Sequence, residues 1–209
     1  MHGKIDVGSE QDVGSLFSVT LPLTQSDITI ATHQSNLDNL DIYPWLSDHW
    51  SFFIQRFESE KLAHALMLEG PMGVGKTTLA SAMVAKLLCR EEAPRACGQC
   101  RSCILLAAAA HPDYFDLQPE EGSEVIKVDQ VRTMISKLDL TTSISERKVA
   151  YIHPAECMNA AAANALLKSL EEPAGDTVLI LVSDNPGRLP VTIRSRCQAI
   201  SVKQPATRD

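Results

Sequence analysis

The residues best able to do chemistry form one glycine-rich run at positions 70–77, which ends in a lysine and a threonine. The run fits the pattern G-x-x-x-x-G-K-[ST] at each fixed position. Its glycines let backbone N–H groups approach phosphate oxygens, and the following helix adds partial positive charge at its N-terminus. In this pattern the lysine reaches the β- and γ-phosphates, and the hydroxyl holds Mg²⁺. We therefore expect ATP or ADP with Mg²⁺ to bind the following residues: Gly70, Gly73, Gly75, Lys76, Thr77 and Thr78.

The segments on either side of this run support the phosphate-binding interpretation. An apolar stretch at residues 65–68 precedes it, and a helical pattern at 78–88 follows it. A strand, a loop and a helix in this order are the context that the motif requires. A chance glycine-rich turn is the alternative, and the flanking elements weigh against it.

A second group with chemical potential is a cluster of cysteines in the pattern C-x7-C-x2-C-x2-C. In a reducing compartment such spacing is typical of metal binding rather than of disulfides. Four thiolates suit Zn²⁺ at about 2.3 Å, and they leave no open position, so the predicted zinc is structural. An iron–sulfur cluster and four unrelated buried thiols are the alternatives. The predicted ligands are Cys89, Cys97, Cys100 and Cys103, whereas Cys157 and Cys197 are expected in the core.

The composition limits the class of protein. The chain has 209 residues, 44% of them hydrophobic and 22% charged, which is ordinary for a globular protein. A formal net charge of −7 argues against a broad DNA-binding surface but leaves room for a local basic patch. No apolar run approaches the length of about 20 residues that spans a bilayer, and the acidic N-terminus lacks an apolar signal core. We expect a cytoplasmic protein with no membrane partner.

The elements that must position these residues alternate along the chain. Helical spacing predicts helices at residues 43–60, 78–88, 104–110, 128–138 and 160–170, the first capped by Ser47 or Asp48. Apolar or alternating runs predict strands at residues 65–68, 113–117, 147–152, 177–182 and 198–202. Strands that alternate with helices imply an α/β fold, a parallel sheet with helices on both faces.

Several runs together resemble a known family. They are HALMLEGP at 64–71, the four cysteines, HPDY at 111–114, NALLKSLEEP at 164–173 and SRC at 195–197. Over about residues 43–202 the chain resembles the AAA+ subunits of the bacterial DNA polymerase III clamp loader, and among them the delta-prime subunits. The resemblance implies a P-loop NTPase fold and a part in DNA replication.

The resemblance also implies partners and a role for one arginine. Clamp loaders use ATP to open the ring-shaped sliding clamp and place it on primed DNA. The implied partners are the clamp-loader ATPase subunits and the clamp-opening subunit, and, through the complex, the clamp and primed DNA. In the family the arginine of SRC, here Arg196, enters the ATP site of the neighbouring subunit as an arginine finger. A surface arginine in an ordinary salt bridge is the alternative.

The chain departs from the family's motor subunits at one point. Motor subunits have Asp-Glu where this chain has His153 and Pro154, and neither residue can supply a carboxylate to Mg²⁺ or water. Glu156 is the alternative base, although we expect it to begin the next helix. Asp184 or Asn185 is expected either to touch the γ-phosphate or to form a polar turn.

We therefore predict nucleotide binding with little or no hydrolysis, as in a stator that lends its arginine to a motor. An ATP-hydrolysing motor subunit and another P-loop phosphotransferase are the alternatives.

The two ends of the chain lie outside the resemblance. Residues 1–23 resemble the C-terminal hairpin of histidine-kinase ATPase domains, with two alternating runs around a glycine turn, and residues 24–42 have the composition of a linker. We expect an N-terminal extension at 1–42 and an AAA+ core at 43–205 that contains the zinc module at 89–103. The family's lid and collar domains are expected to be absent from this chain.

Overall fold

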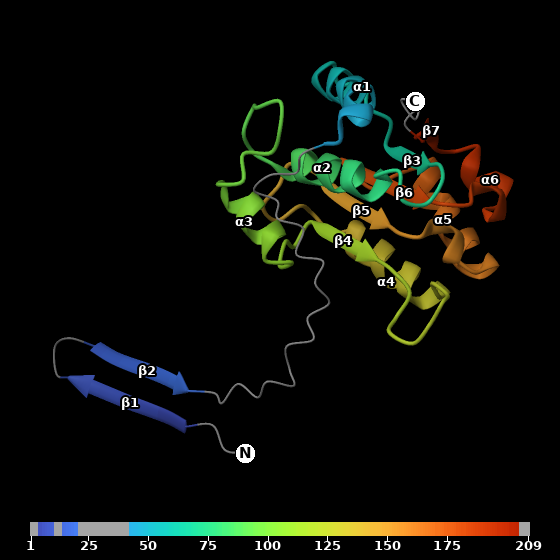
Figure 1. Ribbon diagram of the computed structural model, residues 1–209. Coiled ribbons are helices and arrows are strands. Elements are labelled where there is room, and N and C mark those ends of the chain that lie inside the picture. Colours follow the sequence, from blue (N-terminus) through green and yellow to red (C-terminus); the bar gives the residue numbers. More distant parts are fainter. Residues whose placement is uncertain (1–3, 11–13, 21–41, 205–209) are drawn as a thin grey trace. The chain divides into compact units, whose positions relative to one another are not determined.

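The computed structural model describes residues 4–10, 14–20 and 42–204 (Figure 1). The chain divides into two units, Met1–Ser35 and Asn36–Asp209. In the first unit, β1 (Lys4–Glu10) and β2 (Gly14–Thr20) pair in antiparallel register. This pairing agrees with the predicted hairpin. The predicted linker at 24–42 lies outside the described residues except for its last residue.

The second unit is built on a five-stranded sheet with the strand order β4-β5-β6-β3-β7. All four pairings between neighbouring strands are parallel, so the carboxyl ends of the strands meet at one edge. In such sheets ligands bind in the crevice at that edge. The strands are β3 (Ala65–Glu69), β4 (Tyr114–Leu117), β5 (Lys148–Ile152), β6 (Thr177–Ser183) and β7 (Gln198–Ser201).

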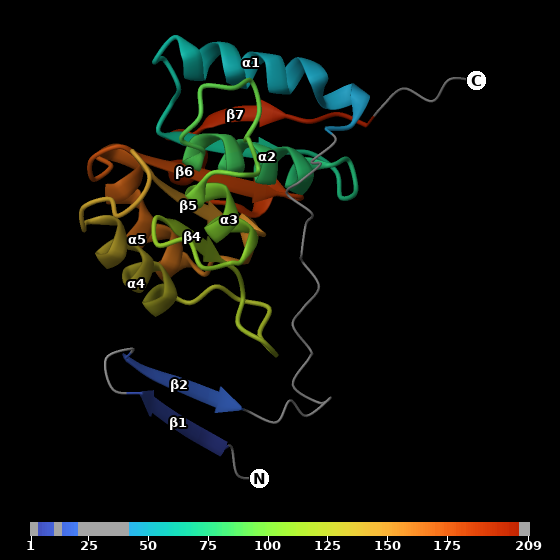
Figure 2. The same cartoon turned by 90° about the vertical axis from the view of Figure 1, so that its left-hand side faces the viewer.

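Helices cover both faces of this sheet (Figures 1 and 2). One face packs against α1 and α2, and the other packs against α4, α5 and α6, so each face has its own apolar core. The described helices of this unit are α1 (Ser47–Glu58), α2 (Lys76–Leu88), α3 (Arg101–Ala107), α4 (Val128–Leu138), α5 (Ala160–Glu171) and α6 (Val191–Arg194). Three short 3-10 helices complete it: η2 (Pro44–Leu46), η3 (Ala155–Cys157) and η4 (Pro186–Arg188). The predicted α/β sandwich is confirmed.

The position of β5 and β6 in the middle of the sheet explains why their sequences are so apolar. Each residue of β5 and β6 is buried, as expected for parallel strands that are covered on both faces. The one charged residue of these two strands is Lys148 of β5, whose side chain is only 3% exposed. Its ammonium donates to the carbonyl oxygens of Lys137 and Leu140, at 2.5 Å each, where α4 ends. This buried charge therefore closes the C-terminus of α4.

Three expectations about the helices need correction. The helix predicted at 104–110 is α3, which begins earlier because the Cys100 side chain accepts the Cys103 N–H and caps it. The predicted cap of α1 was wrong, since Leu46 is at that position and the Ser47 hydroxyl donates instead to the carbonyl oxygen of Pro44. The short helix α6 was not predicted. Among the described residues, no helix combines the length and apolar character needed to cross a bilayer.

Candidate functional site

The glycine-rich loop joins β3 to α2 at the carboxyl edge of the sheet, as the motif predicts. Two of its glycines are required by geometry. Gly70 has a φ of +146°, and a Cβ there would lie 2.1 Å from the carbonyl oxygen of Val202. Gly75, the N-cap of α2, has a φ of +92°, and its Cβ would lie 2.8 Å from the ring of Tyr43. Both backbone conformations are ones that L side chains rarely adopt.

An aromatic pair fixes the loop from the N-terminal side. The Nε1–H of Trp45 donates to the carbonyl oxygen of Val74 at 3.1 Å. The rings of Tyr43 and Trp45 stack with centroids 4.6 Å apart and an angle of 2° between their planes. Local sequence predicts only a helix for this segment, because contacts between segments distant in sequence leave no local pattern.

The first turn of α2 presents the other predicted nucleotide ligands. Lys76, Thr77 and Thr78 occupy that turn, where backbone N–H groups have no partner within the helix. The side chain of Thr77 is exposed, as a Mg²⁺ ligand at this position requires. A Cβ added at Gly73 would meet nothing within 4 Å, so the tip of the loop is open. The loop and helix therefore fit a phosphate group, and all six predicted residues lie together.

The loop lysine has partners within the chain. The side chain of Lys76 is 3% exposed, and its ammonium donates to the carbonyl oxygens of Gly70 and Pro71 at 2.7 and 2.6 Å. It also forms an ion pair with Asp184 Oδ1 at 2.6 Å. Asp184 directly follows β6, the strand next to β3. One of the two polar residues predicted near the phosphates thus reaches the lysine itself.

The end of β5 supplies no carboxylate of its own. His153 stacks on Tyr151 with ring centroids 5.9 Å apart, and its backbone N–H donates to the carbonyl oxygen of Leu117. Pro154 follows, and neither side chain can take the part of an acidic Mg²⁺ ligand.

Glu156 lies in the first turn of the helix that follows β5, as expected. This helix is the short 3-10 helix η3 and not α5. Its Oε1 accepts the backbone N–H groups of Asp184 and Asn185 at 2.9 and 3.0 Å, and its Oε2 is buried without a hydrogen-bond partner. The carboxylate therefore holds the segment after β6. This use weighs against Glu156 as the base that activates water.

Arg196 lies just after α6 and is engaged on its own subunit. Its Nε donates to Glu171 Oε1 at 2.7 Å, Nη2 contacts the same oxygen, and Nη1 donates to the carbonyl oxygen of Thr192 at 3.0 Å. Its side chain is 33% exposed. Within this chain the salt-bridge alternative describes Arg196 correctly, and its role toward another subunit stays a prediction.

The four predicted cysteine ligands come together. Their Sγ atoms all lie within 4.8 Å of one another, and those of Cys97 and Cys103 are 3.9 Å apart. Around Zn²⁺ with bonds of about 2.3 Å, tetrahedral geometry requires sulfur atoms about 3.8 Å apart. The donor set and its spacing therefore fit a tetrahedral metal ion.

Backbone donors favour the thiolate form of Cys100, whereas burial raises the pKa of Cys89 and of Cys103. Cys89 Sγ accepts the N–H groups of Glu91 and Cys97 at 3.5 and 3.4 Å. Burial opposes ionisation of Cys100, but N–H groups of Arg90 and Cys103 outweigh it and lower the pKa of Cys100 to about 6. Thiolates are the form that binds metals.

The remaining two cysteines behave as core residues. Cys157 and Cys197 pack against the core on the α4–α5 face and lie outside the cluster. Burial raises the pKa of Cys197 to about 11, so its thiol stays protonated.

A buried polar network anchors the cysteine module to the sheet. His111 Nδ1 accepts the backbone N–H of Asp113 at 3.1 Å, so in the neutral ring the proton lies on Nε2. Nε2 then donates to Ser102 Oγ at 2.7 Å, and Ser102 donates to the carbonyl oxygen of Leu88 at 2.5 Å. Ser102 belongs to α3 and Leu88 ends α2, so this chain of bonds ties together the helices on either side of the cysteines.

Three backbone N–H groups hold the carboxylate of Asp113. It accepts the N–H groups of Ser143, Ile144 and Ser145 at 2.7, 2.8 and 2.9 Å. Burial opposes its charge, but these donors outweigh burial and lower the pKa of Asp113. For His111, burial itself lowers the pKa, because it disfavours the charged imidazolium. The HPDY run at 111–114, which in the sequence is only part of the resemblance, thus has a structural role in the fold.

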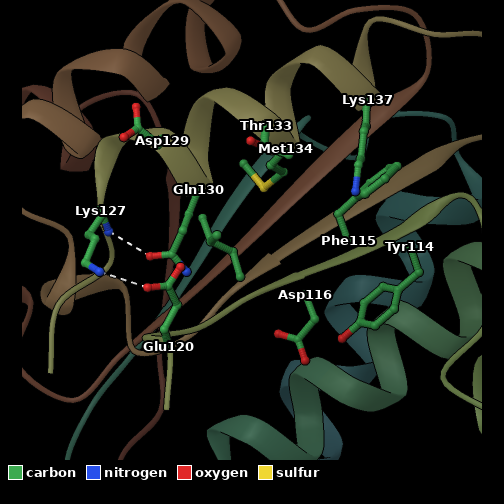
Figure 3. Close-up of a pocket in the computed structure, with 11 residues that line it drawn as sticks. Tyr114, Phe115, Asp116, Glu120, Lys127, Asp129, Gln130, Thr133, Met134 and Lys137 are labelled. Carbon is green, nitrogen blue, oxygen red and sulfur yellow. Dashed lines mark hydrogen bonds and ion pairs between the residues drawn. The ribbon is translucent and has the colours of Figure 1, made fainter. Parts of the chain in front are cut away.

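A groove of about 680 Å³ lies elsewhere, between β4 and α4 (Figure 3). At one end Lys127 forms an ion pair with Glu120 at 2.8 Å, and its backbone N–H donates to Gln130. Two strands, β5 and β6, separate β4 from the strand that carries the glycine-rich loop. The groove is therefore distinct from the phosphate site.

Comparison with known proteins gives consistent relatives. The model of the family described as "DNA polymerase III, delta subunit" matches residues 45–206. A protein named DNA polymerase III subunit delta' from Pseudomonas aeruginosa is 54% identical over 158 residues, covering 75% of this chain and 47% of that protein. Its namesake from Escherichia coli is 38% identical over 157 residues, with coverages of 75% and 47%. The chain spans about half the length of these curated relatives.

A solved structure agrees on the fold. A DNA polymerase III gamma-subunit-related protein from Thermotoga maritima superposes with a TM-score of 0.51 at 22% identity, covering 75% of this chain and 46% of that one. The predicted α/β fold with a parallel sheet is confirmed. Because the family model matches well over half of the sequence, the chain belongs to this DNA polymerase III family, in which its named relatives are delta' subunits.

Proposed function

We propose that this chain is the AAA+ core of a delta'-type clamp-loader subunit that binds nucleotide without hydrolysing it. One observation carries the proposal: the phosphate-binding loop is complete, whereas the residues that follow β5 are His153 and Pro154. The nearby carboxylate of Glu156 accepts two backbone N–H groups through its Oε1. Phosphoryl transfer needs carboxylates for Mg²⁺ and for the nucleophile, and this edge of the sheet lacks them at the expected positions.

In this proposal ATP or ADP binds with its phosphates on the loop. The N–H groups at the start of α2 and the ammonium of Lys76 contact the phosphates, and Thr77 supplies one oxygen to Mg²⁺. With no acidic partner at the end of β5, Mg²⁺ is held less firmly than in a motor subunit. Nucleotide then serves as a structural ligand of the subunit.

We further propose that the cysteine cluster holds a structural Zn²⁺. A four-thiolate set closes the coordination shell, so the metal binds no substrate. The cluster spans the end of α2 and the start of α3, and the Ser102–His111 contact links the same elements from inside. Zinc would fix the long connection between α2 and β4.

The third part of the proposal concerns assembly. The names of the relatives support partners that are other subunits of DNA polymerase III. We infer that Arg196 leaves Glu171 on assembly and enters the ATP site of a neighbouring ATPase subunit. A guanidinium there stabilises charge on the transferring phosphoryl group. The clamp-opening subunit, the sliding clamp and primed DNA are the further proposed partners within the complex.

A reconstituted clamp loader that contains this protein tests the proposal. Lys76→Ala should leave most of the clamp-loading rate intact, because hydrolysis takes place in other subunits. Arg196→Ala should reduce the ATPase and loading rates. Loss of loading in the folded Lys76→Ala variant, with an unaffected Arg196→Ala variant, would instead identify a motor subunit.

A further inference from the structure

The ammonium of Lys76 has used all of its hydrogen-bonding capacity. A lysine ammonium carries three N–H donors. Here two of them point to the carbonyl oxygens of Gly70 and Pro71, and the third meets the carboxylate of Asp184. The side chain is 3% exposed, so solvent offers little further contact. A phosphate can therefore reach this ammonium only by taking the place of one of these acceptors.

Asp184 is the acceptor that a phosphate replaces most directly. The two carbonyl oxygens belong to the loop and carry no net charge, whereas the carboxylate carries the same sign of charge as a phosphate. Its side chain is 29% exposed, whereas that of the lysine is 3% exposed. A polyphosphate that approached with Asp184 in place would meet a like charge within the site.

Glu156 holds this carboxylate in position. Its Oε1 accepts the N–H of Asp184 itself at 2.9 Å and that of Asn185 at 3.0 Å. These two bonds fix the backbone at residue 184, directly after the buried end of β6. Glu156 thus acts through Asp184 and is a positioning residue.

We propose that Asp184, positioned by Glu156, takes the place of a phosphate beside Lys76. The carboxylate thereby sets how tightly the loop binds nucleotide and whether it prefers ATP or ADP. The inference deepens the proposed function and rests on nucleotide binding at this loop. Apparent affinity decreases as the fraction of molecules with a free lysine decreases, so breaking the contact raises affinity. Because the lysine serves the β- and γ-phosphates, the carboxylate competes with the γ-phosphate of ATP more than with ADP. The wild-type protein accordingly favours ADP.

The test is equilibrium binding of ATP and ADP, each with Mg²⁺, to the purified protein and its variants. Asp184→Asn should tighten ATP binding on the order of tenfold and ADP binding less. Glu156→Ala should act in the same direction, whereas Glu156→Gln keeps an acceptor oxygen and should stay near wild type. Asp129→Asn removes the same charge from an exposed ion pair on α4 and should leave both affinities unchanged.

The outcomes separate this inference from the proposed function. Binding that depends on Lys76 but is equal in wild type and Asp184→Asn would overturn the inference and leave nucleotide binding standing. No Lys76-dependent binding in any folded variant would overturn both. A double-mutant cycle of Lys76→Met and Asp184→Asn in urea unfolding should give a coupling between the two residues, and the absence of coupling would contradict the contact itself.

Discussion

Arg196 and Glu171 form an ion pair on the surface of the subunit, with the guanidinium Nε and Nη2 on one carboxylate oxygen. Both residues lie in runs that resemble the clamp-loader family, the one in SRC and the other in NALLKSLEEP. The carboxylate holds the side chain that the proposal assigns to a neighbouring ATP site. Assembly would exchange this carboxylate for a phosphate, another oxyanion to which a guanidinium binds strongly.

The first prediction follows from the exposure of this pair. Their side chains are 33% and 50% exposed, and such pairs contribute less than about 1 kcal/mol to stability. Arg196→Ala should therefore change the free energy of unfolding by less than about 1 kcal/mol. The ATPase rate of a reconstituted complex should fall by a factor on the order of 10³. Urea unfolding and steady-state ATPase assays measure the two effects, and an unchanged ATPase rate would remove the arginine-finger role.

The second prediction concerns the cysteine cluster. Cys97→Ser should abolish stoichiometric zinc and lower the free energy of unfolding by about 3 kcal/mol or more, because the metal couples to folding. Metal analysis of the purified protein and urea unfolding give the two readouts. Cys157→Ser, which removes a thiol outside the cluster, should keep its zinc. A Cys97→Ser protein with full zinc content would refute the ligand assignment.

The third prediction is that the stability of the folded protein depends on pH through His111. Burial lowers the pKa of this imidazole, so the folded protein binds its proton less readily than the unfolded chain does. Its contribution to stability is complete above the unfolded pKa of about 6.5 and is lost as pH falls through the lower, folded pKa. Asp113, whose pKa is also lowered, adds a loss at more acidic pH.

Urea unfolding between pH 5 and pH 8 tests this dependence. His111→Gln cannot take up a proton and should flatten the slope of stability against pH below neutrality, although its stability at pH 8 falls. His49→Gln, on α1 and away from the network, should keep the wild-type slope. An unaltered slope in His111→Gln would show that another group is responsible.

The fourth prediction compares two glycines of the phosphate loop. Both have positive φ, but a Cβ at Gly73 meets open space, whereas one at Gly75 lies 2.8 Å from the Tyr43 ring. Gly73→Ala should cost about 1 kcal/mol for the left-handed backbone alone. Gly75→Ala should cost about 2 kcal/mol or more, because the aromatic pair must also move. Equal costs in urea unfolding would contradict the packing of that pair on the loop.

Local sequence was enough to predict much of this fold. The apolar residues of α4 recur at three- and four-residue steps, so its bounds were predicted at residues 128–138 as they are found. The glycine-rich loop and the cysteines carry spacings that describe a whole site within a short segment. In contrast α6 is four residues long, which is too short for a periodic pattern to appear.

The contacts that decide how the site behaves could not be predicted in this way. Lys76 meets Asp184 because β3 and β6 are neighbours in the sheet, and the order of strands is a property of the whole fold. Glu156 does lie in the first turn of a short helix, η3. Its bonds to two backbone donors after β6 join segments that are distant in sequence and leave no local pattern.

The central claim is that the loop binds nucleotide and the subunit does not hydrolyse it. In the most direct measurement, the purified protein is mixed in excess with Mg²⁺-ATP, and both the bound nucleotide and the ADP formed are followed over time. The Lys76→Ala variant is the control. We expect binding that Lys76→Ala abolishes, with no ADP above the level of that variant. ADP formed at a rate that depends on Lys76 would contradict the claim and identify an ATPase motor.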